Sequence, residues 1–177
     1  MNPRLCALPP HLILETLLDK LRAFCNAGFR AAVVISGHHG SQEDLRGVSR
    51  AFAEAFGFPI FLRTDPELVA DRYVGDRVGR YELSQMLSIR SDLVAMDHAS
   101  YASSDPLGRF AQNPDVSETT AEYGIEILDA QIAPIGEAVA SFVIDQAFPI
   151  RSISMREVEH VWETIEARKM EWATMSP

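Results

Sequence analysis

The expected fold is decided by the stretch VVISGHHGS, residues 33–41. An apolar run too short for a helix stops at a glycine, presents two adjacent histidines, and passes a second glycine and a serine into a helical pattern. This succession predicts a strand, a loop and a helix. In open α/β sheets, ligands gather outside the carboxyl ends of the strands, so His38 and His39 occupy a position where such folds place their chemistry.

The segments around this stretch alternate between helix and strand. Apolar residues recur at three- and four-residue steps in 10–27 and again in 41–56, which predicts two amphipathic helices. Short apolar runs at 31–35 and 58–62 predict strands, and the short connections imply parallel strands with right-handed crossovers. We therefore expect an α/β protein, a three-layer α/β/α sandwich around a mainly parallel sheet.

The middle of the chain is less regular. Residues 63–79 are rich in charge and weak in periodicity, which predicts a long loop that could form one wall of a binding site. Apolar spacing predicts a helix at 81–89, and the run at 93–96 predicts a third strand.

The last third of the chain is predicted to be helical. A long helical pattern opens at Ser117, and Pro134 within it should kink or divide the helix. Ser154 and Glu157 have the spacing of a capping box, which predicts the start of a final helix that runs to about Ala173.

Composition restricts the class of protein. The 177 residues are 47% hydrophobic and 23% charged, as expected of one globular domain. The net charge of -9 argues against nucleic-acid binding, and the sequence contains no apolar stretch long enough to span a bilayer. The only cysteines, Cys6 and Cys25, are too few for a disulfide framework, which favours a reducing cytoplasm.

Three motifs resemble those of creatininase-family metal-dependent amidohydrolases, and they occur in the same order. Residues 28–41 resemble the family's Gly-Phe, strand and Asn-Gly-His-x-Gly-Asn segment. Residues 77–84 resemble its His-Ala-Gly-x-x-Glu-Thr-Ser segment, and residues 108–124 resemble its Gly-Asp-Pro and Ala-Thr-x-Glu-x-Gly segment. The resemblance implies a single creatininase-like domain over 1–177 that lacks the family's N-terminal metal-ligand segment.

The resemblance also implies roles for individual residues. His38 matches a metal ligand and Glu82 matches a catalytic residue, and the metal implied is Zn²⁺ or Mn²⁺. Arg77 stands in place of the family's proton-shuttle histidine, Arg80 where some members have a glutamate, and Gly40 where some have a carboxylate ligand. An arginine cannot accept the proton, although it can bind a carboxylate or phosphate. We therefore expect weak or absent metal binding by this chain alone.

Three functions are compatible with these residues. The first is a creatininase-like hydrolase of non-peptide C–N bonds, in amides, lactams or formamides, whose missing ligands come from another chain or an upstream segment. The second is a degenerate, non-catalytic relative that acts as an oligomer or partner-binding subunit and could bind a small anion. The third is an anion or nucleotide site at the helix near Ser41, which lacks a phosphate-loop lysine. Without the family's early strand, an edge of the sheet or an apolar face would be uncovered, and we therefore expect a homo-oligomer.

Overall fold

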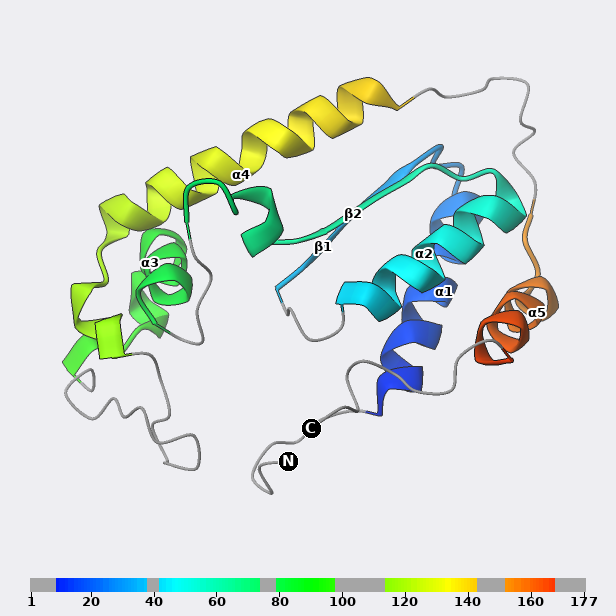
Figure 1. Ribbon diagram of the computed structural model, residues 1–177, viewed down its shortest axis with the longest axis horizontal. Helices are drawn as coiled ribbons and strands as arrows, with labels where there is room; N and C mark the ends of the chain where they lie inside the picture. Colours follow the sequence, from blue (N-terminus) through cyan, green and yellow to red (C-terminus); the bar gives the residue numbers. More distant parts are fainter. Residues whose placement is uncertain (1–8, 38–41, 74–78, 98–113, 143–151, 168–177) are drawn as a thin grey trace. The chain divides into compact units, whose positions relative to one another are not determined.

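The computed structural model describes residues 9–37, 42–73, 79–97, 114–142 and 152–167 (Figure 1). The chain divides into two compact units. The first unit comprises residues 1–64 and 137–177, and the second comprises residues 65–136.

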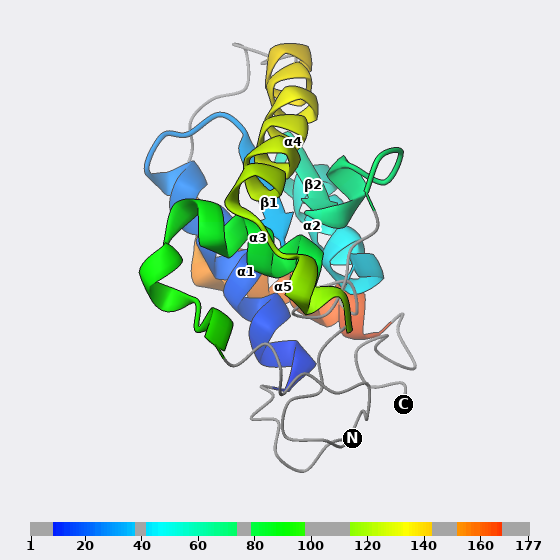
Figure 2. The same cartoon turned by 90° about the vertical axis from the view of Figure 1, so that its left-hand side faces the viewer.

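The first unit contains a parallel pair of strands. Strand β1 (Ala32–Ser36) pairs with β2 (Ile60–Thr64) in the register Ala32 to Ile60 and Ser36 to Thr64 (Figures 1 and 2). The predicted parallel strands are confirmed, but β2 begins later than predicted. Pro59 has no N–H to donate, so it contributes only its carbonyl oxygen, which accepts from the Ala32 N–H at 3.0 Å.

Three helices pack against one another and share a buried core with this pair of strands. They are α1 (Pro10–Asn26), α2 (Gln42–Phe56) and α5 (Met155–Glu166). Their apolar faces meet in one buried cluster, which consists of Leu14, Leu18, Leu21, Cys25, Ala32, Leu45, Val48, Phe52, Phe58, Leu62, Ile153, Val158, Val161 and Ile165. Burial in this cluster raises the pKa of the Cys25 thiol from 9.0 to about 11.

Local sequence signals set the ends of these helices. Gly28 and Gly57 follow α1 and α2 with φ of +89° and +63°, left-handed conformations that favour glycine. Ser154 and Glu157 form the predicted capping box at the start of α5. Asn26 then ties the end of α1 to the segment before α5, because its side chain exchanges hydrogen bonds of 2.9 and 2.7 Å with the backbone of Ile153.

The second unit is built from short helices and the first part of a long one. It contains 3₁₀ turns at Pro66–Leu68 (η2), Ser91–Leu93 (η3) and Pro114–Glu118 (η5), together with helix α3 (Arg80–Ile89). Helix α4 (Ala121–Ser141) begins in this unit and continues past Pro134 as a single helix (Figure 1). The predicted division at this proline does not occur.

The predicted strand at 93–96 is wrong. Leu93 closes a 3₁₀ turn and is 62% exposed, and residues 93–96 contain no strand. Among the described residues the sheet has two strands, which gives a mainly helical α/β protein. In the part of the chain that is described, no helix combines the length and apolarity needed to cross a membrane.

Candidate functional site

Of the predicted site residues, Glu82 is the one that the structure describes. It lies in the first turn of α3 and is half-buried. A carboxylate in the first turn of a helix interacts favourably with the helix dipole. His38 and Arg77, together with His39 and Gly40, lie outside the described residues, so their predicted roles stay predictions.

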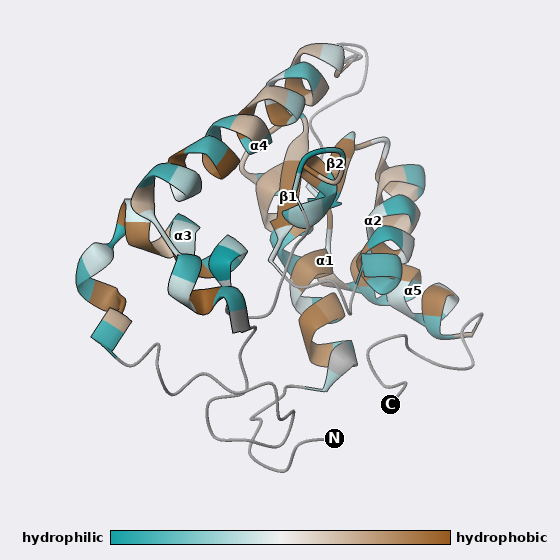
Figure 3. Cartoon of the chain, turned by 60° about the vertical axis from the view of Figure 1, so that its left-hand side comes forward, coloured by the Kyte–Doolittle hydropathy of each residue, from teal (hydrophilic) through white to brown (hydrophobic). Residues whose placement is uncertain are grey.

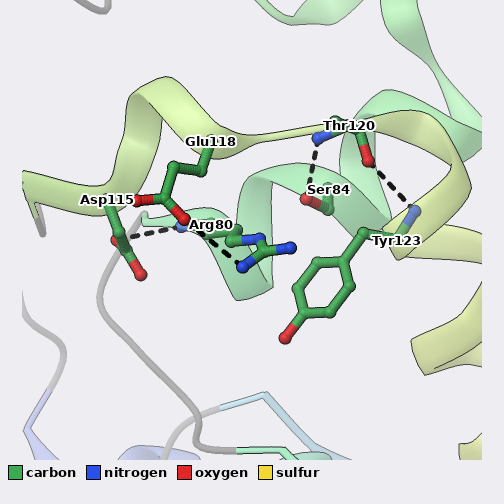
Figure 4. A network of polar contacts seen from close by, with 6 residues as sticks. All are labelled: Arg80, Ser84, Asp115, Glu118, Thr120 and Tyr123. Atoms are coloured by element: carbon green, nitrogen blue, oxygen red, sulfur yellow. Dashed lines mark hydrogen bonds and ion pairs between the residues drawn. The ribbon is translucent and has the colours of Figure 1, made fainter.

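The start of α3 is capped by a residue far away in the sequence. The N-cap position is Gly79, which has no side chain to accept from the first N–H groups of the helix. Asp115 in η5 supplies the acceptor, because its Oδ1 lies 3.2 Å from the backbone N of Arg80 (Figure 4). The turn that carries Glu82 is therefore attached directly to η5.

The Arg80 side chain makes a second link to the same region. Its Nη1 donates to Glu118 Oε2 at 3.3 Å, and its Cζ lies 4.0 Å from the centre of the Tyr123 ring (Figure 4). This pairs an ion contact with a cation–π contact on a guanidinium whose side chain is 38% exposed. Arg80 stands where some family members have a glutamate, and in this chain its side chain contacts Glu118 and Tyr123.

Ser84 forms the third link, one turn further along α3. Its hydroxyl is fully buried and accepts from the Thr120 N–H at 3.2 Å. Thr120 in turn caps α4, because its Oγ1 accepts from the Tyr123 N–H at 3.2 Å (Figure 4). A Cβ on Gly124 would collide with the carbonyl group of Ser84, so the two helices meet here at backbone distance.

A buried side-chain amide on α4 forms a further link to α3. Gln131 on α4 donates through Nε2 to the Tyr81 hydroxyl at 2.9 Å and to Gln85 Oε1 at 3.1 Å. Gln131 is 8% exposed, so its amide needs these partners. Helix α3 is thus held to η5 and α4 by polar contacts along its first two turns.

The structure therefore brings together two of the three motifs singled out in the sequence. The motif at 77–84 contributes Arg80 and Ser84, and the motif at 108–124 contributes Asp115, Thr120 and Gly124. We call these residues, with Glu118 and Tyr123, the α3 clamp. Sequence reasoning assigned no role to Asp115 or Glu118, although a glycine at a helix start is a signal that the cap must come from elsewhere.

A metal site would need more donors than this chain has been assigned. Within the described ranges, no group of three or more His, Cys, Asp or Glu side chains is placed to hold a metal ion. The sequence assigns one metal ligand, His38, whereas a hydrolytic zinc site uses three protein ligands. The donors assigned in this chain therefore do not make up such a site.

Comparison with known proteins identifies the fold. One solved structure, described as the crystal structure of creatinine amidohydrolase (creatininase), superposes with a TM-score of 0.63. The match covers 83% of this chain and 67% of that chain, with 18% sequence identity. No protein-family model matches the sequence, and no curated protein matches it. The chain has a creatininase-like fold.

Proposed function

We propose that this protein is a creatininase-like hydrolase that acts on non-peptide C–N bonds, in amides, lactams or formamides. The observation that carries the proposal is the contact between two creatininase-like motifs at the turn that presents Glu82. The fold match adds support, because it covers most of the chain. We further propose that the protein is cytoplasmic, and that residues 1–177 form a single domain with a three-layer α/β/α arrangement.

Glu82 is the residue proposed to act on the substrate. A half-buried carboxylate at a helix start can accept a proton from an attacking water and return it to the leaving nitrogen. Arg77, in place of the family histidine, cannot accept that proton but can hold a substrate carboxylate in fork geometry. A bound Zn²⁺ or Mn²⁺ would supply Lewis acidity and a more acidic water.

The incomplete donor set makes a second chain part of this proposal. His38 would contribute one metal ligand, and the remaining ligands would come from another copy of this chain or from a partner chain. The active form is then an oligomer, and a dilute monomer should be inactive and hold metal weakly.

The test is a hydrolysis assay over a range of protein concentrations. The purified chain, loaded with Zn²⁺ or Mn²⁺, is assayed against lactams and formamides while light scattering records its assembly state. We expect turnover in the assembled fraction that is lost in His38→Ala and in Glu82→Gln. Turnover that survives both substitutions, or no turnover in any assembled state, would overturn the proposal.

A second candidate function is a non-catalytic, oligomer-forming subunit that binds a small anion. Apolar side chains at seven-residue spacing on α4, Ile125, Ile132 and Val139, are between 51% and 63% exposed, and apolar bands recur along this helix (Figure 3). Val33 and Ile35 on β1 are also exposed, at 37% and 40%. Exposed apolar surface of this kind commonly marks an association site.

The second candidate predicts a different set of results. Ile132→Asp should shift the chain towards monomer in light scattering, and Ala133→Asp, in the next position of the same helix, is the control. Phosphate or a small carboxylate should bind with an affinity that Arg77→Ala removes, while no substrate is hydrolysed. A wild-type chain that stays monomeric at all concentrations would exclude this function.

A further inference from the structure

Arg80, a charged residue of the α3 clamp, lies in the same helix turn as Glu82 and links that turn to η5 and α4. Arg80 is the first residue of α3, and Glu82 follows it by two positions. The backbone N–H of Arg80 is held by Asp115, and its guanidinium is held by Glu118 and by the ring of Tyr123. The ring of Tyr123 is itself contacted at an edge by Tyr73, with centroids 5.5 Å apart.

Arg80 supplies the positive charge among the residues of the α3 clamp. Asp115, Glu118 and Glu82 are all acidic, and Asp115 and Glu118 both bond to Arg80. Replacing the guanidinium with a neutral group would remove the ion partner of Glu118 and the cation over the Tyr123 ring, while the bond from the Arg80 backbone to Asp115 would remain. The first turn of α3 would then be linked to η5 through the Asp115 bond without the side-chain link to Glu118, so it should open more readily.

We propose that Arg80 is a positioning residue, which holds the first turn of α3 against η5 and α4 and thereby fixes the orientation of the Glu82 carboxylate. This inference rests on the function proposed above for Glu82. It gives a role to an arginine that departs from the family's pattern, because Glu118 and Tyr123 supply its partners within the same unit.

The proposal is tested by NMR on the full chain, without reference to activity. Two signals are followed: the side-chain carboxyl carbon of Glu82, identified by its loss in Glu82→Gln, and the amide hydrogen exchange of Leu83. The Leu83 N–H donates to Gly79 O at 3.0 Å and so reports the first turn of α3. A role in stability alone would leave the Glu82 carboxyl signal of the folded protein unchanged.

In Arg80→Met we expect the Glu82 carboxyl signal to move and Leu83 exchange to rise roughly three- to thirty-fold, as expected for loss of a partly exposed ion pair together with a cation–π contact. Arg80→Lys should keep the ion pair and lose the planar stacking, so its changes should be smaller. The control is Arg90→Met, which removes the ion pair of Arg90 with Asp92 beyond the other end of α3 and should change neither signal.

The outcomes separate this inference from the proposed function. If Arg80→Met does not fold, Tyr123→Leu and Arg80→Lys give the same readouts with milder changes. Unchanged Glu82 and Leu83 signals in folded variants would overturn the positioning role, whether or not the protein is an enzyme. Signals that move as expected in a protein without turnover would support the positioning role and count against the hydrolase.

Discussion

Each of the two units of this protein is stabilised internally by a different kind of interaction. The first unit is built around fourteen buried apolar side chains, twelve from three helices and two strands and two, Phe58 and Ile153, from the segments that precede β2 and α5. Among the described residues of the second unit, the buried apolar side chains are those of Pro66, Leu68, Val69, Tyr81, Val116 and Ile127, and polar contacts link α3, η5 and α4. The candidate catalytic residue lies in the unit held by polar contacts, so substitutions in the first unit should affect stability and those in the α3 clamp should affect the site.

The largest effect is expected in the core of the first unit. Phe52 is fully buried and packs on Phe56 and Phe58, with ring centroids 4.7 and 6.0 Å away. Phe52→Ala should lower the free energy of unfolding by about 3–5 kcal/mol, measured by urea denaturation followed by circular dichroism. Phe29→Ala is the control, because Phe29 is 59% exposed and should cost much less. Equal losses in the two variants would contradict the assignment of the core.

The next effect tests the close approach of α3 and α4. Gly124→Ala places a methyl group against the Ser84 carbonyl and should destabilise the protein by about 1–3 kcal/mol in the same assay. Gly136 lies in the same helix with open space where a Cβ would lie, so Gly136→Ala should instead stabilise by up to about 1 kcal/mol. Two changes of the same sign would refute the contact.

Removal of the capping box at the start of α5, in the first unit, should have a moderate effect on the free energy of unfolding. The Ser154 hydroxyl accepts from the Glu157 N–H at 3.3 Å and completes the capping box of α5. Ser154→Ala should cost about 1 kcal/mol of unfolding free energy by urea denaturation. Glu159→Ala, at an exposed position of the same helix, should change stability by less than about 0.5 kcal/mol. A cost for Glu159→Ala as large as that for Ser154→Ala would argue against a specific cap.

The smallest effect is expected for an exposed ion pair. The Arg90 guanidinium, 2.7 Å from Asp92, holds the pKa of that carboxyl below its usual value of 3.8. Because the folded pKa is lowered, any stabilisation is present above pH 3.8 and is lost as the pH falls through the folded pKa. Asp92→Asn should leave the thermal midpoint at about pH 7 unchanged, since exposed pairs contribute little. A clear drop in that midpoint would show that the pair is structurally important.

The parts of the structure that the sequence predicts are those set by local signals. Helix spacing, the glycines after α1 and α2 and the Ser154 capping box are local signals, and they predict α1, α2 and the start of α5 closely. The end of α5 is predicted less well, because the helix ends at Glu166 and not near Ala173. The strand predicted at 93–96 is wrong because the apolar character of a run of four residues does not distinguish a strand from other local structure.

The candidate site could be predicted only in part. Resemblance to a family identified Glu82 and the motifs around it, since those residues are contiguous in the sequence. The clamp could not be found in this way, because Arg80 meets Asp115 and Glu118 across 35 and 38 positions of chain. Such polar contacts have no periodicity, so no pattern in the sequence indicates them.

The central claim is that Glu82, held in place by the α3 clamp, performs acid–base chemistry on a C–N bond. The most direct test compares the lactam or formamide hydrolysis rate of assembled, Zn²⁺- or Mn²⁺-loaded wild type with that of Glu82→Gln, which keeps the size of the side chain and removes its charge. The account predicts a rate for Glu82→Gln that is roughly 10²- to 10⁴-fold lower, with assembly unchanged. Equal rates in the two proteins, or no hydrolysis by the assembled wild type, would contradict it.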